Sequence, residues 1–193
     1  EQNTKQKLND YINKWISIKI NYVLKSLIDL KNIKENNSSI KALAYQLYEN
    51  NGVLKREMVS EYLKNLEQNE RKILRDIGVK FGRYHVFLHQ LIKPEAVSLR
   101  TLLWKNFHQK YFNLKPPTFG LNFINDKEFK NQHFMLLCGF EKFETLFVRI
   151  DILERLFMLI IKSSSKEYSK AKMTPEMLNL LGCSKENFKK LLE

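Results

Sequence analysis

The sequence contains few of the residues that form turns, disulfides or metal sites. Among 193 residues there are 6 Gly, 4 Pro and 2 Cys. Few turn-forming residues favour long helices over a β fold with many turns. Cys138 and Cys183 are too few and too far apart in the chain for a disulfide framework or a zinc site. This cysteine usage is typical of a reducing compartment, so we expect a cytoplasmic protein.

Long hydrophobic runs are also missing. No stretch of about 18 apolar residues occurs, and the most apolar segment, Leu153–Ile161, contains Glu154 and Arg155. No signal peptide is recognisable, so we expect no membrane partner. The chain starts at Glu1 rather than Met and ends at Glu193 inside an amphipathic pattern, which predicts a segment of a longer polypeptide.

Catalytic motifs are absent from the sequence. There is no Gly-rich phosphate loop followed by Lys and Ser or Thr, and therefore no expected site for ATP or Mg²⁺. His85 and His89 are four residues apart but have no acidic neighbour in the sequence, which favours packing or phosphate contact over a metal site. The carboxylate pairs are interpreted as solvated surface: Glu57/Glu61, Glu67/Glu70 and Asp151/Glu154. We expect no catalytic, cofactor-binding or metal-binding residue, and no enzyme activity in this chain alone.

Hydrophobic residues make up 44% of the sequence, with 13 Phe and 8 Tyr, which is enough for a core. Apolar residues at helical spacing predict a mainly α fold, beginning with one long helix over 5–31. Short strands are expected only near 79–88 and 145–149. We expect a helical bundle-like domain over 1–113, a linker over 114–125 and a smaller helical domain over 126–193. The order helix, glycine, strand, helix occurs twice, around Gly78 and Gly139.

The last twenty residues have the spacing of a helix-turn-helix. Thr174 and Pro175 suit a helix start, and Gly182 suits the turn before a second helix. That second helix has three basic residues: Lys185, Lys189 and Lys190. We predict a part resembling a winged helix, with its wing beyond the last residue. Two functions are possible for this part: contact with nucleic acid through its second helix, or docking of a protein.

Positive charge is concentrated in one segment. The net charge is +12, and residues 71–115 hold ten Lys and Arg but only the acids Asp76 and Glu95, a net +8. Residues 35–70 have four basic and six acidic residues. A local basic cluster favours a polyanion site, although a solvated Lys-rich surface is the simpler alternative.

The segment Gly78–Leu88 is the strongest candidate for such a site. Glycines flank a strand in which Lys80 and Arg83 would contact phosphates and Tyr84 would stack on a base. An ordinary structural hairpin is the alternative. With the basic residues that follow in the chain, and those of the last helix, the predicted nucleic-acid contacts are Lys80, Arg83, Tyr84, Lys93, Arg100, Lys185, Lys189 and Lys190.

Several segments together resemble a family of helicases. The segments Ile77–Leu88, Leu91–Glu95 and Leu99–Trp104 look like a block of alphaproteobacterial helicase-related proteins, which resemble the ATP-dependent RNA helicase of the mitochondrial degradosome. The similarity extends, in the same order, to further segments: Ala44–Val53, Cys138–Phe140, Arg149–Arg155 and Thr174–Cys183. None of these segments is a catalytic motif.

The resemblance implies a superfamily 2 motor of two RecA-like domains, which would bind ATP and Mg²⁺, followed by helical C-terminal domains. This chain would be the C-terminal accessory region. Its implied partners are single-stranded RNA, with DNA as the alternative, the motor core in the same polypeptide, and an exoribonuclease. The competing hypothesis is a protein-interaction module that docks the exoribonuclease or the motor core.

Overall fold

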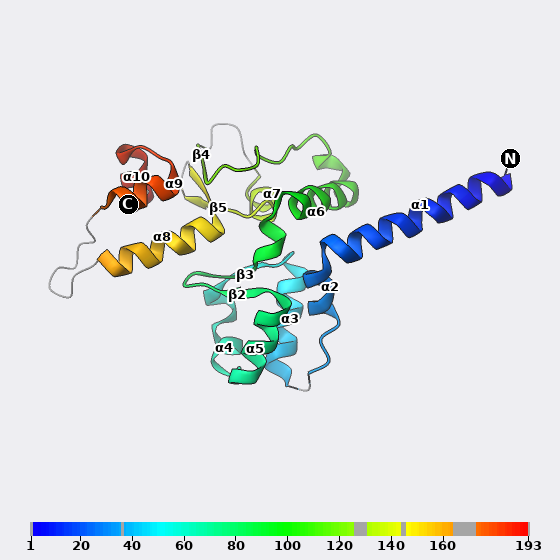
Figure 1. Cartoon of the computed structure of the whole chain (residues 1–193), viewed down its shortest axis with the longest axis horizontal. Coiled ribbons are helices and arrows are strands. Elements are labelled where there is room, and N and C mark those ends of the chain that lie inside the picture. The colour runs from blue at the N-terminus through cyan, green and yellow to red at the C-terminus, as the bar shows by residue number, and fades with distance from the viewer. Residues whose placement is uncertain (1, 36, 126–130, 144–145, 164–172, 193) are drawn as a thin grey trace.

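The computed structural model describes residues 2–35, 37–125, 131–143, 146–163 and 173–192 (Figure 1). The protein is mainly helical, with two small antiparallel sheets, so the predicted fold class is confirmed. The α-helices are α1 (Gln2–Val23), α2 (Lys25–Lys31), α3 (Ser38–Glu49), α4 (Ser60–Lys64), α5 (Gln68–Ile77), α6 (Pro94–Phe107), α7 (Gln132–Leu137), α8 (Ile150–Ser163), α9 (Pro175–Leu181) and α10 (Lys185–Leu192). Short 3-10 helices are η1 (Arg56–Val59), η2 (His89–Ile92) and η3 (Gln109–Tyr111). The strands are β1 (Val53–Lys55), β2 (Val79–Phe81), β3 (His85–Leu88), β4 (Phe123–Asn125), β5 (Phe140–Phe143) and β6 (Leu146–Arg149).

The single helix expected over 5–31 is interrupted at Leu24, which separates α1 from α2. Helix α2 packs on α3 and buries Leu30, whereas α1 extends away from the rest of the molecule (Figure 1). The apolar pattern therefore serves two purposes. Its last turns enter the core, and most of its first part stays in contact with solvent.

Residues 38–88 form a compact unit. Helix α3 is followed by β1, then by α4 and α5, then by the β2–β3 hairpin, and β3 is the central strand of the sheet β1-β3-β2. Val79 pairs with Leu88, and Val53 pairs with Phe87 on the other side of β3. This order of elements and strands is that of a winged helix, in which α4 and α5 are the helix-turn-helix and the β2–β3 loop is the wing. A winged-helix arrangement therefore lies within residues 38–88, where the sequence did not predict one.

A second sheet repeats this topology. Helix α6 is followed by β4, α7 and the β5–β6 hairpin, with the strand order β4-β6-β5. Gly78 and Gly139 both have positive φ after a helix, at 111° and 86°, and each donates its N–H to the carbonyl three residues earlier. Glycine is favoured here because side chains disfavour the left-handed region. The repeat around these two glycines, which the sequence predicted, is thus a repeat of backbone structure.

Two of the strand segments were predicted from the sequence and the others were not. Strands β2 and β3 lie within 79–88 and β6 lies within 145–149, as expected. Strand β4 occupies the last residues of the predicted linker, and β1 and β5 were missed. Each of these has only three or four residues, too few for a clear alternating pattern. The division into two domains stays a prediction, although one buried cluster contains both Val97 of α6 and Phe134 of α7.

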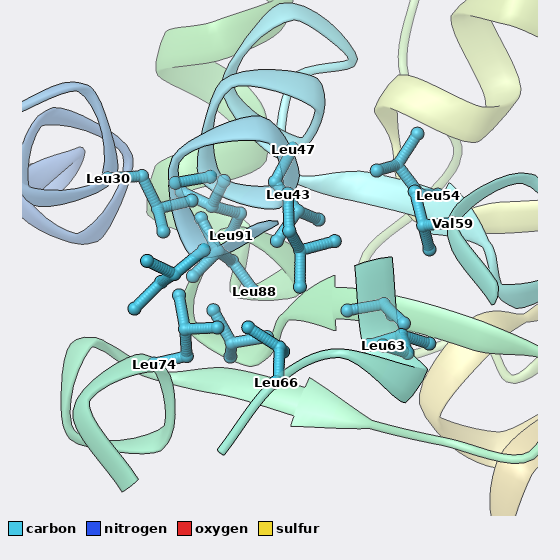
Figure 2. Close-up of a cluster of buried hydrophobic side chains, with 14 of the residues drawn as sticks. Leu30, Leu43, Leu47, Leu54, Val59, Leu63, Leu66, Leu74, Leu88 and Leu91 are labelled. Carbon is cyan, nitrogen blue, oxygen red and sulfur yellow. The ribbon is translucent and has the colours of Figure 1, made fainter. Parts of the chain in front are cut away.

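The largest hydrophobic core joins the first unit to α2 before it and to η2 after it. Leucines from α2, α3, α5, β3 and η2 meet in one cluster, most of them fully buried (Figure 2). Leu43 and Leu47 of α3 face Leu74 and Leu88 across this core. The cluster fixes α5 and the hairpin relative to α3, and it therefore positions the exposed side of both.

The C-terminal helices form the predicted helix-turn-helix. Thr174 caps α9 by accepting a hydrogen bond from the N–H of Met177, and Gly182 ends the helix with a φ of 67°. Phe188 of α10 is fully buried in a cluster with Leu156 of α8 and Leu181 of α9. Helices α8, α9 and α10 therefore pack as one group beside the second sheet.

Replacement of Leu43 by Ala should lower the free energy of unfolding by about 2–5 kcal/mol, because it leaves a cavity in the closed core. Tyr45→Ala is the matched control on the same helix, since Tyr45 is 61% exposed and should cost little. Urea denaturation followed by circular dichroism measures both. Equal losses for the two variants would contradict the position of the core.

Candidate nucleic-acid interface

The wing of the first unit, residues 82–84, is held by one carboxylate from α8. The backbone N–H groups of Arg83, Tyr84 and His85 all donate to Glu154, with N···O distances of 3.0 Å from Tyr84 and 2.8 Å from His85. Successive N–H groups in a turn form a concave anion site. That site is occupied by a carboxylate of the protein itself, so the wing has only side chains to offer to a ligand.

Gly82 is required for this close approach. A Cβ at Gly82 would lie 2.7 Å from Oε1 of Glu154, inside van der Waals contact. On the other side of the wing, the guanidinium of Arg56 donates to the carbonyl of Gly82 at 2.7 Å, and its backbone N–H donates to the carbonyl of Tyr84 at 2.7 Å. The wing is therefore fixed from two sides.

His85 links the two sheets through a buried charge network. Its Nδ1 lies 3.1 Å from Oε1 of Glu154, and its Nε2 lies 3.3 Å from Oε2 of Glu141 on β5. Glu141 is also paired with Lys55 of β1 at 3.2 Å. The imidazole is only 4% exposed, and both of its nitrogens face carboxylates. His85 thus joins β3, β5 and α8 and is not accessible as a phosphate contact.

The pKa values in this network reflect burial and opposing hydrogen bonds. Burial alone would lower the pKa of His85, but hydrogen bonds to Glu141 and Glu154 and their negative charges raise it above 6.5. Burial would raise the pKa of each carboxyl group. The hydrogen bonds from His85 outweigh burial at both, helped by Lys55 at Glu141 and by the wing N–H groups at Glu154, and so lower both pKa values.

A groove of about 1000 Å³ runs between the hairpin and helices α8 and α9. Its basic side chains come from three elements: Lys80 of β2, Arg83 of the wing, and Arg155 and Lys162 of α8. All four are exposed, and none forms an ion pair among the described residues. We call these four residues the groove cations.

Acidic residues also line the groove, but most are already paired. Asp151 is bound by the guanidinium of Arg149 at 2.7 Å, and Glu154 is bound to the wing and His85. Glu176 of α9 is exposed. The groove cations therefore outnumber the carboxylates that remain to neutralise them, and the groove has a positive character.

Tyr84 lies at the tip of the wing beside a second, smaller groove. Its ring packs on Phe157 of α8, with a distance of 3.8 Å between ring centroids and an angle of 35° between the planes. The residue is nevertheless 47% exposed. The smaller groove, about 510 Å³, also contains Arg83, so this arginine borders both grooves. The arrangement leaves part of an aromatic side chain next to a cation, which suits a stacked base beside a phosphate.

Helix α5 adds positive charge beside the hairpin. As the second helix of the helix-turn-helix it occupies the place of a recognition helix. Lys72 and Arg75 are exposed on it, and the guanidinium of Arg75 lies 5.7 Å from the ring centroid of Phe81 on β2. Basic side chains therefore continue from α5 over β2 to the wing.

The prediction that Arg100 contacts nucleic acid is wrong. Arg100 is 3% exposed, and its guanidinium donates to the carbonyls of Asn51 and Leu91. Burial lowers its pKa to about 10. This arginine fastens α6 to the turn before β1 and to η2. It cannot reach a ligand without local unfolding.

The remaining predicted residues lie apart from the groove cations. Lys93 is exposed at the start of α6 and lines a different pocket, together with Glu95, Asp29 and Asp76. Exposed Lys185 and Lys189 are on α10 and do not line the groove. Lys190 is also on α10, but its side chain is outside the described residues. Of the eight predicted residues, the structure brings together Lys80, Arg83 and Tyr84.

The sequence analysis did not identify two of the groove cations, Arg155 and Lys162, as candidate contacts. They lie about 75 residues from the hairpin, and the only available signal was their seven-residue spacing, which places both on one side of α8.

The prediction that Glu70 and Glu154 lie on a solvated surface was also wrong. Glu154 holds the wing, and Glu70 is 7% exposed because it closes the capping box of α5 with Glu67.

No protein family, curated protein or solved structure matches this chain. The resemblance to helicases therefore stays a prediction. Within the described ranges no helix is long and apolar enough to cross a membrane, and no cluster of His, Cys, Asp and Glu is arranged to hold a metal ion.

The His85 network should make stability depend on pH. Since the folded pKa of His85 is above its ordinary value of 6.5, its stabilisation is complete below that pH and is lost as the pH rises through the folded pKa. The two carboxylates have lowered folded pKa values, so their contribution is complete above 4.5 and is lost only as the pH falls through those values. Urea denaturation from pH 5 to 9 should show stability declining above 6.5.

The His85→Gln variant should be less stable at pH 6 and lack most of that decline, because glutamine keeps a hydrogen bond but does not titrate. His89→Gln is the matched control, since His89 is exposed and outside the network. A decline that persists unchanged in His85→Gln, or that disappears in His89→Gln, would show that another group is responsible.

Proposed function

We propose that this chain is a non-catalytic accessory region that binds single-stranded nucleic acid in the groove between the β2–β3 hairpin and α8. The proposed ligand is RNA, with DNA as the alternative. The observation that carries the proposal is the convergence of Lys80, Arg83, Arg155 and Lys162 on one groove, with an aromatic ring beside it. Non-specific binding of single strands combines a cationic path for the backbone with aromatic surfaces for the bases.

The rigidity of the wing supports this function. Arg83 and Tyr84 project from a loop whose amides are bound by Glu154 and whose carbonyls are bound by Arg56. A side chain on a fixed backbone loses less conformational entropy when it binds a ligand. The wing therefore presents a cation and an aromatic ring in a set position beside the groove.

The wider context is proposed from the resemblance. In a superfamily 2 helicase, such a region would guide the strand that enters or leaves the motor, while ATP hydrolysis would occur in the motor domains. A cytoplasmic location and contact with the motor core or an exoribonuclease belong to the same proposal. The positive groove supports the nucleic-acid part of it. The cytoplasmic location rests on the cysteine usage, and the contacts with the motor core and the exoribonuclease rest on the resemblance alone.

Lys80→Ala, Arg83→Ala and Arg155→Ala should each weaken binding of a short single-stranded RNA. A variant that makes one phosphate contact fewer releases fewer counterions when it binds. The magnitude of the negative slope of log affinity against log salt should therefore decrease by about 0.7 for each lost contact. Fluorescence anisotropy at several salt concentrations measures this slope.

Lys41→Ala and Lys64→Ala are the controls, since both residues are exposed and outside the groove. Equal losses in both sets would show diffuse attraction to a basic protein. Absence of binding by the unmodified chain at low salt would reject the proposal in favour of a module that docks proteins and barely touches RNA.

Tyr84→Ala should reduce RNA affinity by about 1–3 kcal/mol, if a base stacks on the exposed part of the ring, with little change in the salt slope. Tyr84→Phe is the companion variant, because it keeps the aromatic ring and should keep most of the affinity. A fall in the salt slope for Tyr84→Ala would mean that the loss of the ring displaces Arg83 rather than a base.

A further inference from the structure

Helix α1 exposes a continuous apolar stripe. Leu8, Tyr11, Trp15, Ile18 and Tyr22 are separated by three, four, three and four residues, and their exposure ranges from 57% to 77%. We call these five residues the α1 seam. The helix extends away from the rest of the molecule, and the seam residues belong to none of its buried clusters (Figure 1). Large aromatic side chains exposed in one row are typical of an interaction surface.

The body of the protein uses a different side of α1. Ile20 and Val23 pack against the main core, and Lys19 is paired with Glu95 of α6. At about 100° per residue, Ile20 and Val23 lie about 160° and about 100° from the centre of the seam, and Lys19 lies about 60° from it, at the edge of the seam. Helix α1 is therefore anchored along one side and leaves the seam unpartnered on another.

The spacing of the seam is that of a coiled coil. With Leu8, Trp15 and Tyr22 at position a, Tyr11 and Ile18 fall at position d. Ile12 at position e and Ile16 at position b are also exposed, at 43% and 38%, and broaden the apolar side beyond the seam. The heptad spacing gives a second helix a continuous row of a and d residues to pack against.

The residues at positions e and g, on either side of the seam, determine which charge the partner should have. In the same register Lys5 occupies position e, and Lys7 and Lys14 occupy position g, whereas Lys19, also at e, is already paired with Glu95. Ile12 is the remaining e residue inside the helix, and no acidic residue falls at e or g between 5 and 21. Residues at e and g face their counterparts across a coiled coil and set the choice of partner. A second copy would oppose lysine to lysine, whereas glutamates on the partner would form interhelical ion pairs.

We propose that the α1 seam docks an amphipathic helix of another polypeptide, one with apolar residues at a and d and acidic residues at e and g. Trp15 lies at the centre of the seam and is the principal anchor. The seam shares no residue with the groove between the hairpin and α8, so an experiment that rejects this proposal does not reject the proposed RNA site, and the reverse is also true.

The test uses the complete chain and two synthetic peptides of about 21 residues, or three heptads, with Leu at a and d. One peptide has Glu at e and g and the other has Lys. The acidic peptide should bind, more weakly as salt is raised, and should shift the tryptophan fluorescence of the chain to shorter wavelength, and the basic peptide should do neither. Because Trp104 also fluoresces, Trp15→Phe should abolish the shift. Ile18→Glu should weaken binding at least about thirtyfold, as expected for a central apolar contact.

Asn13→Glu is the matched control, because it adds the same charge at an exposed position f on the far side of the helix. Ile18 is itself 60% exposed, so circular dichroism of Ile18→Glu should match that of the unmodified chain. The proposal is overturned if neither peptide binds, if both bind equally, or if Asn13→Glu loses as much affinity as Ile18→Glu.

Other occupants give distinct results that would also overturn it. A second copy would appear as a dimer in sedimentation of the unmodified chain, lost in Ile18→Glu. A membrane would appear as a shift of Trp15 fluorescence with anionic phospholipid vesicles but not with the acidic peptide. Nucleic acid would appear as RNA binding that Ile18→Glu reduces and Asn13→Glu does not.

Discussion

The carboxylate of Glu154 holds together parts of the chain that are about 70 residues apart. It accepts hydrogen bonds from three successive backbone N–H groups, those of Arg83 and Tyr84 in the wing and that of His85 in β3. It also faces the His85 imidazole, which in turn faces Glu141 on the second sheet. A carboxylate with four donors and little exposure is costly to leave unpaired, so the wing, β5 and α8 are fixed relative to one another. The groove between the hairpin and α8 exists because this contact sets both of its walls.

The same network explains how an acidic residue serves a positive groove. The carboxylate of Glu154 accepts hydrogen bonds from backbone amides and faces His85, whose pKa is raised, and the carboxylate of Asp151 forms an ion pair with Arg149. The groove cations keep no such partner among the described residues. Charge in the proposed RNA site therefore depends on which carboxylates are already satisfied rather than on the number of acids and bases nearby.

Basic residues in this protein have at least three different roles. Arg100 is buried and satisfies two carbonyls, Lys19 fastens α1 to α6, and Lys80 lines the groove. All three belong to a chain of strong positive charge, and composition does not separate them. Burial decides the role, because a guanidinium enclosed by carbonyls has no free donor for phosphate.

The sequence by itself determined the mainly helical fold, the repeat around Gly78 and Gly139, the helix-turn-helix after Thr174, and the proximity of Lys80, Arg83 and Tyr84. These features depend on local rules: helical spacing of apolar residues, glycine at positive φ and capping by threonine. Only the tertiary structure decided that Glu154 holds the wing, that Arg155 and Lys162 join the groove, that Arg100 is buried and that the α1 seam is exposed. Those outcomes depend on which helix faces which strand, and the short strands β1, β4 and β5, which set that arrangement through long-range pairing, have too few residues to be recognised from their own pattern.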